Sequence, residues 1–263
     1  MVVTIKMEDR KELLKEYFDA VQNKEVKRFM EQCIDTIPDY WFNVPASSTG
    51  KYHPNYALGN GGLMRHTIAM LRFFERLVRN DLYGKSFTKK ELDLLRVACL
   101  MHDSRKSGSD EDFKKLKYTR FDHPILAADV VRSIKTKFIS DKEKEIIATA
   151  IESHMGQWNI DTSKRCKTVL PLPKNKYQKI VHLVDYLAAM KGCEITFDKN
   201  CKSSRLNENK ESNDSTTVDT YVFPFGKYVG TKLVDVKKEH PDYIVWAKKN
   251  IESEPLKTLL THL

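Results

Sequence analysis

Six side chains able to bind a metal constrain the fold of this chain more than any other feature. They are His66, the doublet His102–Asp103, His123, His154 and Asp185. Imidazole nitrogens and carboxylate oxygens suit a divalent hydrolytic metal. Most of the six lie in segments with helical periodicity, so separate helices must bring them to one shared centre. The sequence therefore predicts a helical bundle built around a group of ligands.

Each of the six residues also has a simpler explanation when it is taken alone. A single histidine on an apolar helix face is more often a core residue, and an isolated Asp185 more often caps a helix or pairs with a cation. However, three of the six lie inside apolar stripes, where burying a polar group without a partner costs free energy. A shared metal ion is the partner that serves them together. We therefore predict a metal centre and leave one ion or two open at this point.

The apolar periodicity predicts a mainly α domain, with little strand signal. His66 lies on a stripe with Met70, Phe73 and Leu77, at spacings i, i+4, i+7 and i+11, so it should face the core. Residues 104–121 look like a polar, lysine-rich connection, and Asp141 is the expected cap of the helix that leads to His154. Helices are expected over residues 8–33, 62–80, 91–101, 123–138 and 177–191, and from the cap at Asp141 towards His154.

The chain divides into three parts by composition. Residues 202–217 contain one large apolar residue and many Ser and Asn, as is typical of a flexible linker. After it, two short strand-like runs between Tyr221 and Leu233 are broken by Gly226 and Gly230, and a helix starts near Pro241. We therefore expect a helical domain over residues 1–201, a linker over 202–217 and a small α+β module over 218–263.

Charge and composition limit which kinds of partner the protein can have. The net charge is +9, and residues 202–263 hold 10 Lys/Arg against 9 Asp/Glu, so nearly all the excess lies in the first 201 residues. A basic body favours anionic partners such as nucleic acid, although a lysine-rich solvated surface is the alternative. No apolar run could span a membrane, and five cysteines without a CxxC pair indicate reduced thiols in the cytoplasm. The oligomeric state cannot be read from the sequence.

The segments around the first ligands resemble a known family. Gly61-Gly62-Leu63-Met64-Arg65-His66-Thr67 and Met101-His102-Asp103-Ser104-Arg105-Lys106 are similar to the signature of the HD superfamily of metal-dependent phosphohydrolases. The resemblance extends from about Pro45 to Met190, and the additional histidines match the dinuclear members. It implies an HD-domain helical bundle with two divalent ions (Mn²⁺, Fe²⁺, Co²⁺ or Ni²⁺, with Mg²⁺ also admitted). His66, His102, Asp103 and Asp185 would hold the first ion, and Asp103, His123 and His154 the second.

The same resemblance assigns catalytic and substrate-binding residues. Two adjacent cations acidify water and clamp phosphoryl oxygens, which gives Asp103 a catalytic role as the bridging ligand. Lys106 matches the lysine of the variant His-Asp-x-Gly-Lys and would contact a substrate phosphate, although Arg105 replaces the glycine and an exposed surface lysine is the alternative.

Residues outside the ligand set are candidates for contacting the substrate. The loop that precedes the first ligand offers hydroxyl, amine and imidazole groups to phosphate oxygens, through Ser47, Ser48, Lys51 and His53. Tyr52 replaces the Ser/Thr that a P-loop would need, which excludes ATP binding of that type. Trp158, close to the second metal, could stack on a nucleobase, although core packing is the more common role of such a residue.

The last part of the chain resembles another short module. Pro-Phe-Gly-Lys-x-x-Gly, followed by Asp-Tyr-x-x-Trp, is similar to the small C-terminal module of exodeoxyribonuclease X. The leading hypothesis is a phosphohydrolase that cleaves a phosphoester of a nucleotide or nucleic acid. The alternatives are a 3'-5' exonuclease on RNA or single-stranded DNA and a non-catalytic nucleotide-sensing or nucleic-acid-binding module. No OB-fold-like stretch precedes the HD-like region, which counts against the exonuclease.

Overall fold

The computed structural model divides the chain into two compact units, residues 1–204 and 205–263. It describes residues 7–48, 53–116, 119–193, 218–219, 221–222, 228, 231–250 and 256–261. The predicted linker, residues 202–217, therefore lies outside the described residues. Within the described parts, none of the helices has both the length and the apolar character needed to cross a lipid bilayer.

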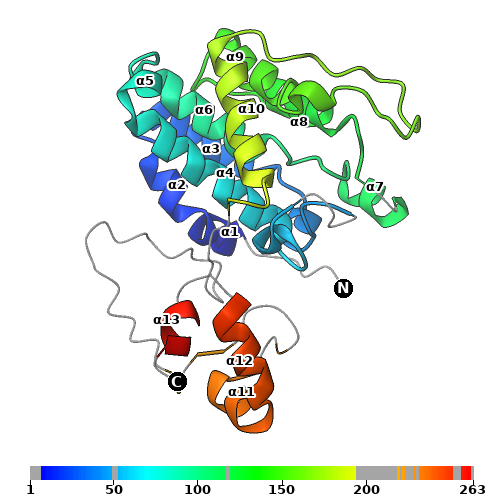
Figure 1. Cartoon of the computed structure of the whole chain (residues 1–263). Coiled ribbons are helices and arrows are strands. Elements are labelled where there is room, and N and C mark those ends of the chain that lie inside the picture. Colours follow the sequence, from blue (N-terminus) through cyan, green and yellow to red (C-terminus); the bar gives the residue numbers. More distant parts are fainter. Residues whose placement is uncertain are drawn as a thin grey trace. The chain divides into compact units, whose positions relative to one another are not determined.

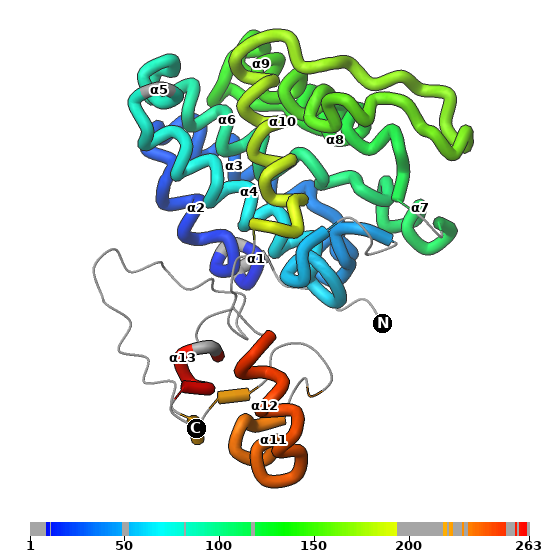
Figure 2. The backbone as a smooth tube through the Cα atoms, viewed as in Figure 1, coloured from blue at the N-terminus to red at the C-terminus, as the bar shows by residue number. Residues whose placement is uncertain are grey.

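The N-terminal unit is a bundle of α-helices (Figures 1 and 2). Its centre consists of α4 (Gly62–Arg79), α6 (Lys89–Met101), α9 (Asp141–Glu152) and α10 (Lys176–Ala189), which pack against one another. Helix α8 (His123–Ser133) packs on α9, and α3 (Lys24–Asp35) packs on α6. The remaining elements are α1 (Met7–Leu13), α2 (Lys15–Ala20), α5 (Asp81–Gly84), α7 (Asp110–Lys115) and the short 3₁₀ helices η1 (Asp39–Phe42), η2 (Asn55–Ala57) and η3 (Gly156–Trp158).

One continuous core holds this bundle together. Its largest fully buried side chains include Trp41, Tyr40, Phe29 and Phe74. Burial of a large apolar side chain contributes roughly 1.5–3 kcal/mol, so these aromatic residues tie η1, α3 and α4 into one body. The predicted mainly α architecture is confirmed, since the described residues form helices and two isolated β-bridges but no strand.

The start of α4 explains the Gly61-Gly62 pair that precedes His66. Gly61 has φ of +70°, a left-handed conformation that glycine adopts without strain. A Cβ on Gly62 would lie 2.2 Å from the carbonyl oxygen of Ala57, so only glycine lets the loop approach the helix this closely. The Arg65 guanidinium then donates hydrogen bonds to the carbonyls of Leu58 (2.7 Å) and Asn60 (2.8 Å). These contacts fix the loop against the first turn of α4 and thereby set the position of His66.

Side-chain caps fix where the other central helices begin. Thr88 and Glu91 form a capping box at α6, and Ser140 and Glu143 form one at α9. The prediction that Asp141 caps α9 is wrong by one residue: Asp141 is the first helical residue, where its negative charge favours the positive end of the helix dipole.

The structure corrects three predictions about where helices begin, end or are absent. The helix expected over residues 8–33 is interrupted between α2 and α3, because Asn23 caps α3 and the N–H groups of Gln22 and Asn23 donate to the buried Asp93 carboxylate at 3.2 and 2.8 Å. The connection expected over residues 104–121 contains α7, which a Ser109–Asp112 capping box starts. Helix α8 ends at Ser133 instead of continuing to residue 138, since Ile134 adopts extended backbone angles.

The second unit has its own small core. The described residues form α11 (Leu233–Glu239), α12 (Pro241–Asn250) and α13 (Leu256–Thr261), and Leu233, Ile244 and Leu256 are among the buried residues. An isolated antiparallel bridge joins Val222 to Lys232, within the two runs expected to form strands. The helix predicted near Pro241 is confirmed, whereas the strands of an α+β module are not found among the described residues.

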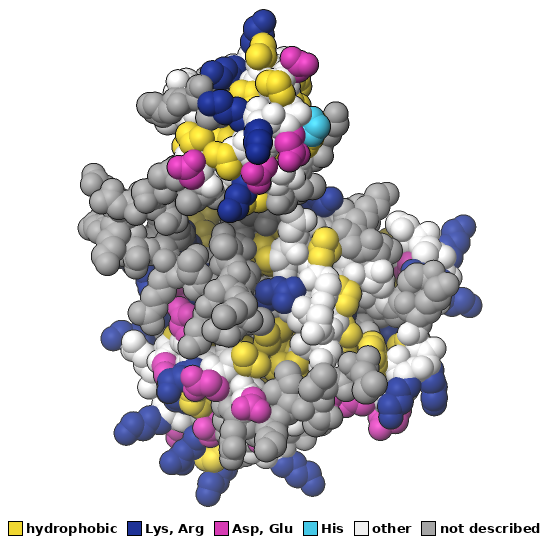
Figure 3. Space-filling model, turned by 90° about the horizontal axis from the view of Figure 1, so that it is seen from below, with side chains coloured by type: hydrophobic (Ala, Val, Ile, Leu, Met, Phe, Trp, Pro, Cys, Tyr) yellow, Lys and Arg dark blue, Asp and Glu magenta, His cyan; other side chains and the backbone are white. Residues whose placement is uncertain are grey.

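Charged side chains are interspersed on the described surface. On the face shown in Figure 3, Lys and Arg side chains are mixed with Asp and Glu side chains. Many cations of the N-terminal unit have carboxylate partners, such as Arg132 with Glu145 at 2.7 Å and Arg96 with Glu75 at 2.6 Å. The four described cysteines, Cys33, Cys99, Cys166 and Cys193, are free thiols.

Candidate metal centre

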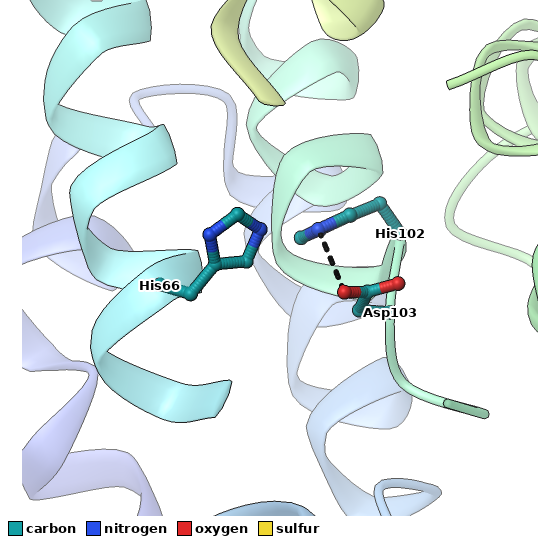
Figure 4. Close-up of side chains that lie close together, drawn as sticks. All are labelled: His66, His102 and Asp103. Carbon is teal, nitrogen blue, oxygen red and sulfur yellow. Dashed lines mark ion pairs between the residues drawn. The ribbon is translucent and has the colours of Figure 1, made fainter. Parts of the chain in front are cut away.

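The structure brings all six candidate ligands together at the centre of the bundle. His66 lies on α4, and His102 and Asp103 follow the last turn of α6 (Figure 4). His123 begins α8, His154 follows the end of α9, and Asp185 lies on α10. Five helices therefore converge on one point, which is the arrangement that the sequence pattern predicts.

The candidate ligand atoms lie at distances compatible with shared cations. His123 Nε2 lies 2.9 Å and His154 Nε2 lies 3.6 Å from Asp103 Oδ1. On the other side, His102 Nε2 lies 3.4 Å from Asp103 Oδ2, and Asp185 Oδ1 lies 3.6 Å from His102 Nε2 and 2.9 Å from His66 Nε2. Since metal–ligand bonds are about 2.0–2.2 Å, two ligands of one ion lie roughly 3–4 Å apart. The observed separations, 2.9–3.6 Å, lie in this range or just below it.

Two overlapping groups of ligand atoms share Asp103. One consists of His66, His102 and Asp103, and the other of Asp103, His123 and His154, with the ligand atoms of each group within 4.8 Å of one another. Asp185 adjoins the first group through its contacts with His66 and His102. A carboxylate with its two oxygens directed to two groups of imidazoles is the geometry expected for a bridging ligand.

The same local contact orients three of the histidines. The Nδ1 atoms of His102, His123 and His154 lie 2.8, 2.5 and 2.8 Å from the carbonyl oxygens of Cys99, Arg120 and Ile151, each three residues earlier. With the proton on Nδ1, each ring donates to the backbone and presents the Nε2 lone pair to the centre. Such contacts fix the tautomer and the ring orientation of metal-binding histidines.

Unsatisfied buried atoms also indicate that a cation belongs here. Within the described residues, His102 Nε2, His123 Nε2 and Asp103 Oδ1 are buried without a hydrogen-bond partner. The short distances between them lack hydrogen-bond geometry. A buried polar group without a partner costs roughly 1–3 kcal/mol, and divalent ions would satisfy all three atoms. The residues present therefore fit a divalent metal centre.

Electrostatics keeps most ligands in the protonation state that a metal needs. Burial lowers the pKa of His154 to about 3, and burial together with the nearby Lys106 ammonium lowers the pKa of His123. Burial raises the pKa of Asp103, but Lys106 and the neighbouring histidines outweigh this and hold it well below its usual range. In His102 the opposite balance holds: burial lowers the pKa, and the Asp103 and Asp185 carboxylates raise it above its ordinary value. Neutral His123 and His154 beside ionised Asp103 form a ready ligand set for one cation.

Lys106 lies beside the centre. Its Nζ contacts Asp103 Oδ2 at 2.6 Å, and its side chain is only 13% exposed, so the reading as an exposed surface lysine is wrong. Arg105 occupies the position at which the resembling motif has glycine. Its guanidinium donates to the carbonyl of Thr36 at 2.8 Å, which ties the turn after α6 to the end of α3.

The candidate substrate-binding residues differ in where they lie. The His53 ring lies 5.2 Å from the His66 ring, its Nδ1 is buried without a partner among the described residues, and burial lowers its pKa to about 3. Ser47 is half-buried and Ser48 is exposed, and Lys51 lies outside the described residues. Their contacts with a phosphate stay predictions. Trp158 is 50% exposed, so the alternative of core packing is wrong for this residue.

Two residues gain importance only in the structure. His182 places Nδ1 2.7 Å from the carbonyl oxygen of His154, and Tyr186 lies next to Trp158 with ring centroids 5.6 Å apart. His182 lies three residues before the candidate ligand Asp185, but helical periodicity alone could not predict its contact with His154. The only signal for Tyr186 is its position directly after Asp185.

Comparison with known proteins supports the family resemblance. Residues 63–190 match the HD domain family. The chain is 26% identical over 190 residues to the 3'-5' exoribonuclease YhaM of Geobacillus sp. (strain WCH70), an alignment that covers 70% of this chain. The chain spans about half, 53%, of the length of that relative. No solved structure is significantly similar to the chain.

Proposed function

We propose that this protein is a metal-dependent phosphohydrolase that cleaves a phosphoester bond in a nucleotide or a nucleic acid. The observation that carries the proposal is the pair of ligand groups sharing Asp103. The match of residues 63–190 to the HD domain supports it independently. Divalent cations held by these groups supply the Lewis acidity that acidifies water and neutralises charge on the phosphoryl oxygens.

The side chains of this chain have distinct parts in that reaction. Asp103, as the ligand common to both groups, would hold a cation bound in either group. The backbone carbonyls that accept from His102, His123 and His154 keep their Nε2 atoms directed inward. Lys106 Nζ donates to Asp103 Oδ2 at 2.6 Å, which supports a role for its ammonium in contacting a phosphate oxygen of the substrate.

The experiment that tests the proposal combines metal analysis with a substrate screen. Purified protein should contain first-row divalent metal and should hydrolyse at least one nucleotide, cyclic dinucleotide or oligonucleotide. An Asp103→Ala variant should lose both metal and activity while its circular dichroism stays helical. Metal-loaded protein that leaves every substrate of the screen intact would refute the hydrolytic function and favour a non-catalytic binding module.

A second candidate is a 3'-5' exonuclease that acts on RNA or single-stranded DNA. The similarity to an exoribonuclease over 190 residues favours it. A strand labelled at its 5' end should then be shortened to a ladder of labelled strands, while nucleoside monophosphates are released from its 3' end. Hydrolysis of free nucleotides without any ladder would favour the first candidate. The likeness of residues 218–263 to the module of exodeoxyribonuclease X is part of this proposal, and deletion of that unit should weaken binding of the strand.

A further inference from the structure

Three aromatic rings lie together on the surface beside the metal centre. Trp158 of η3 packs near His182 and Tyr186 of α10, with ring centroids 6.5 Å (Trp158–His182) and 5.6 Å (Trp158–Tyr186) apart. The Trp158 and Tyr186 rings are inclined by only 31°, yet Trp158 is 50% and Tyr186 37% exposed. The pair therefore presents two tilted, solvent-exposed aromatic surfaces, which an ordinary protein core would cover.

The rings are connected directly to the metal centre. Trp158 follows His154 by four residues, Tyr186 follows Asp185, and His182 contacts the carbonyl of His154. Asp185 is 17% exposed at its side chain, whereas those of His66, His102 and Asp103 are at most 1% exposed. Asp185, the chain neighbour of Tyr186, is therefore the most exposed of these four candidate ligands.

A basic loop begins beside Trp158. Residues 159–170 form a hairpin that we call the basic hairpin: an isolated bridge joins Ile160 to Val169, and Leu170 N–H donates to the carbonyl of Asn159 at 2.9 Å. It carries the exposed cations Lys164, Arg165 and Lys167. Its one carboxylate, Asp161, accepts hydrogen bonds from the backbone N–H groups of the hairpin itself, at Ser163, Arg165 and Cys166. The hairpin, which begins directly after Trp158, thus carries net positive charge.

We propose that Trp158 and Tyr186 stack against unpaired bases of a single-stranded nucleic acid whose phosphate backbone passes along the basic hairpin. The inference deepens the proposed function, because it names the substrate class presented to the same centre. Aromatic faces combined with nearby cations are the combination that binds single strands with little sequence preference. A duplex keeps its bases stacked inside, so the aromatic pair selects the unpaired strand.

Binding should be measured without hydrolysis. The full chain, kept in EDTA, is titrated into fluorescein-labelled oligo(U), and affinity is followed by anisotropy. Trp158→Ala and Tyr186→Ala should each weaken binding about 5- to 150-fold, the range that corresponds to one lost base–aromatic contact. Trp158→Phe should keep most of the affinity, because it retains a flat ring. Circular dichroism of each variant checks that the helices persist.

The chain offers a matched control residue with the same exposure. Tyr83, at α5, is 37% exposed like Tyr186. Tyr83→Ala should bind oligo(U) as the unmodified protein does. If this control loses as much affinity as the Trp158 and Tyr186 variants, the proposal fails, since exposed aromatic area in general would account for binding.

Base dependence separates stacking from a structural effect. An abasic strand of the same length should bind the unmodified protein more weakly, and Trp158→Ala should cause no further loss on that strand. Lys164→Ala and Lys167→Ala should each flatten the dependence of log affinity on log salt by about 0.7, as expected for one phosphate contact to a single strand. Equal binding of base-bearing and abasic strands would overturn the proposal. The proposal would also be overturned if the unmodified protein is a dimer that dissociates in Trp158→Ala, because the rings would then lie at an interface between two copies.

The outcomes for the two proposals differ. If oligo(U) binds through Trp158 and Tyr186 but no substrate is cleaved after metal loading, the hydrolytic function fails and the aromatic site stands. If strands are cleaved and the two alanine variants bind and cleave normally, the aromatic site fails and the hydrolytic function stands.

Discussion

Replacing Gly156 with alanine should disturb the centre from a position outside the ligand set. Gly156 has φ of +53°, and an added Cβ would lie 2.1 Å from Cε1, 2.4 Å from Nε2 and 2.5 Å from Nδ1 of His182. The left-handed backbone costs an alanine roughly 1–2 kcal/mol. Forcing the His182 ring aside costs about 1–3 kcal/mol more, as in an overpacked core. The variant should therefore lose about 2–5 kcal/mol of unfolding free energy, which for a unit of this size lowers the melting temperature by roughly 4–20 °C.

A second substitution separates the two contributions. In a His182→Ala background the steric conflict disappears, so Gly156→Ala should then cost only the roughly 1–2 kcal/mol of backbone strain. Thermal melts of the four proteins, followed by circular dichroism, give the coupling energy between the two positions. A coupling energy of about 1–3 kcal/mol is expected for residues in contact. If Gly156→Ala lowers the unfolding free energy by the same amount in both backgrounds, or by less than about 0.5 kcal/mol, the steric reasoning is wrong.

The same variant should reach the metal centre through His154. Displacing His182 removes its contact with the His154 carbonyl, 2.7 Å in the structure. Loss of such an outer contact typically reduces metal affinity about 10- to 100-fold. Equilibrium dialysis against Mn²⁺ should show this loss in Gly156→Ala, and unchanged affinity would contradict the link between η3 and the centre.

Three further predictions follow from caps, charges and ligands. The metal-free protein should lose stability as the pH falls from about 6.5 towards 3, because the folded pKa of His154 is about 3 while unfolded histidine titrates near 6.5. At about pH 5 the loss of unfolding free energy from His154 is about 2 kcal/mol, and the raised pKa of His102 opposes it. Equal unfolding free energies in urea at about pH 7.5 and about pH 5 would contradict this prediction. Mn²⁺ at about 100 times its dissociation constant should stabilise the N-terminal unit by about 2.7 kcal/mol in thermal melts, and the stabilisation should be smaller in His123→Ala. Melting temperatures that change neither with Mn²⁺ nor with a chelator would show that the protein has no such site. Thr88→Ala should remove the cap of α6 and lower the unfolding free energy by about 1 kcal/mol, while the metal content stays unchanged. Loss of metal in that variant would contradict the prediction, because it would show that the cap also holds the ligands in position.

Helix periodicity predicted the central helices well and their interruptions poorly. Helices α4, α6 and α10 begin and end within two residues of the expected positions, because apolar stripes and capping residues are local signals. The break between α2 and α3 depends on the Asp93 carboxylate, which accepts backbone hydrogen bonds from residues 70 and 71 positions earlier. No local pattern contains that contact.

The order of histidines and aspartates along the chain was sufficient to identify the six candidate ligands, since their chemistry is a property of the residues themselves. It also fixed which helices must meet. Only the tertiary structure decided that Asp103 lies between two groups of imidazoles, that Lys106 contacts it, and that His182 and Tyr186 join Trp158 at the edge of the centre. These relations depend on how α6, α8, α9 and α10 pack, and packing depends on contacts between side chains far apart in the sequence.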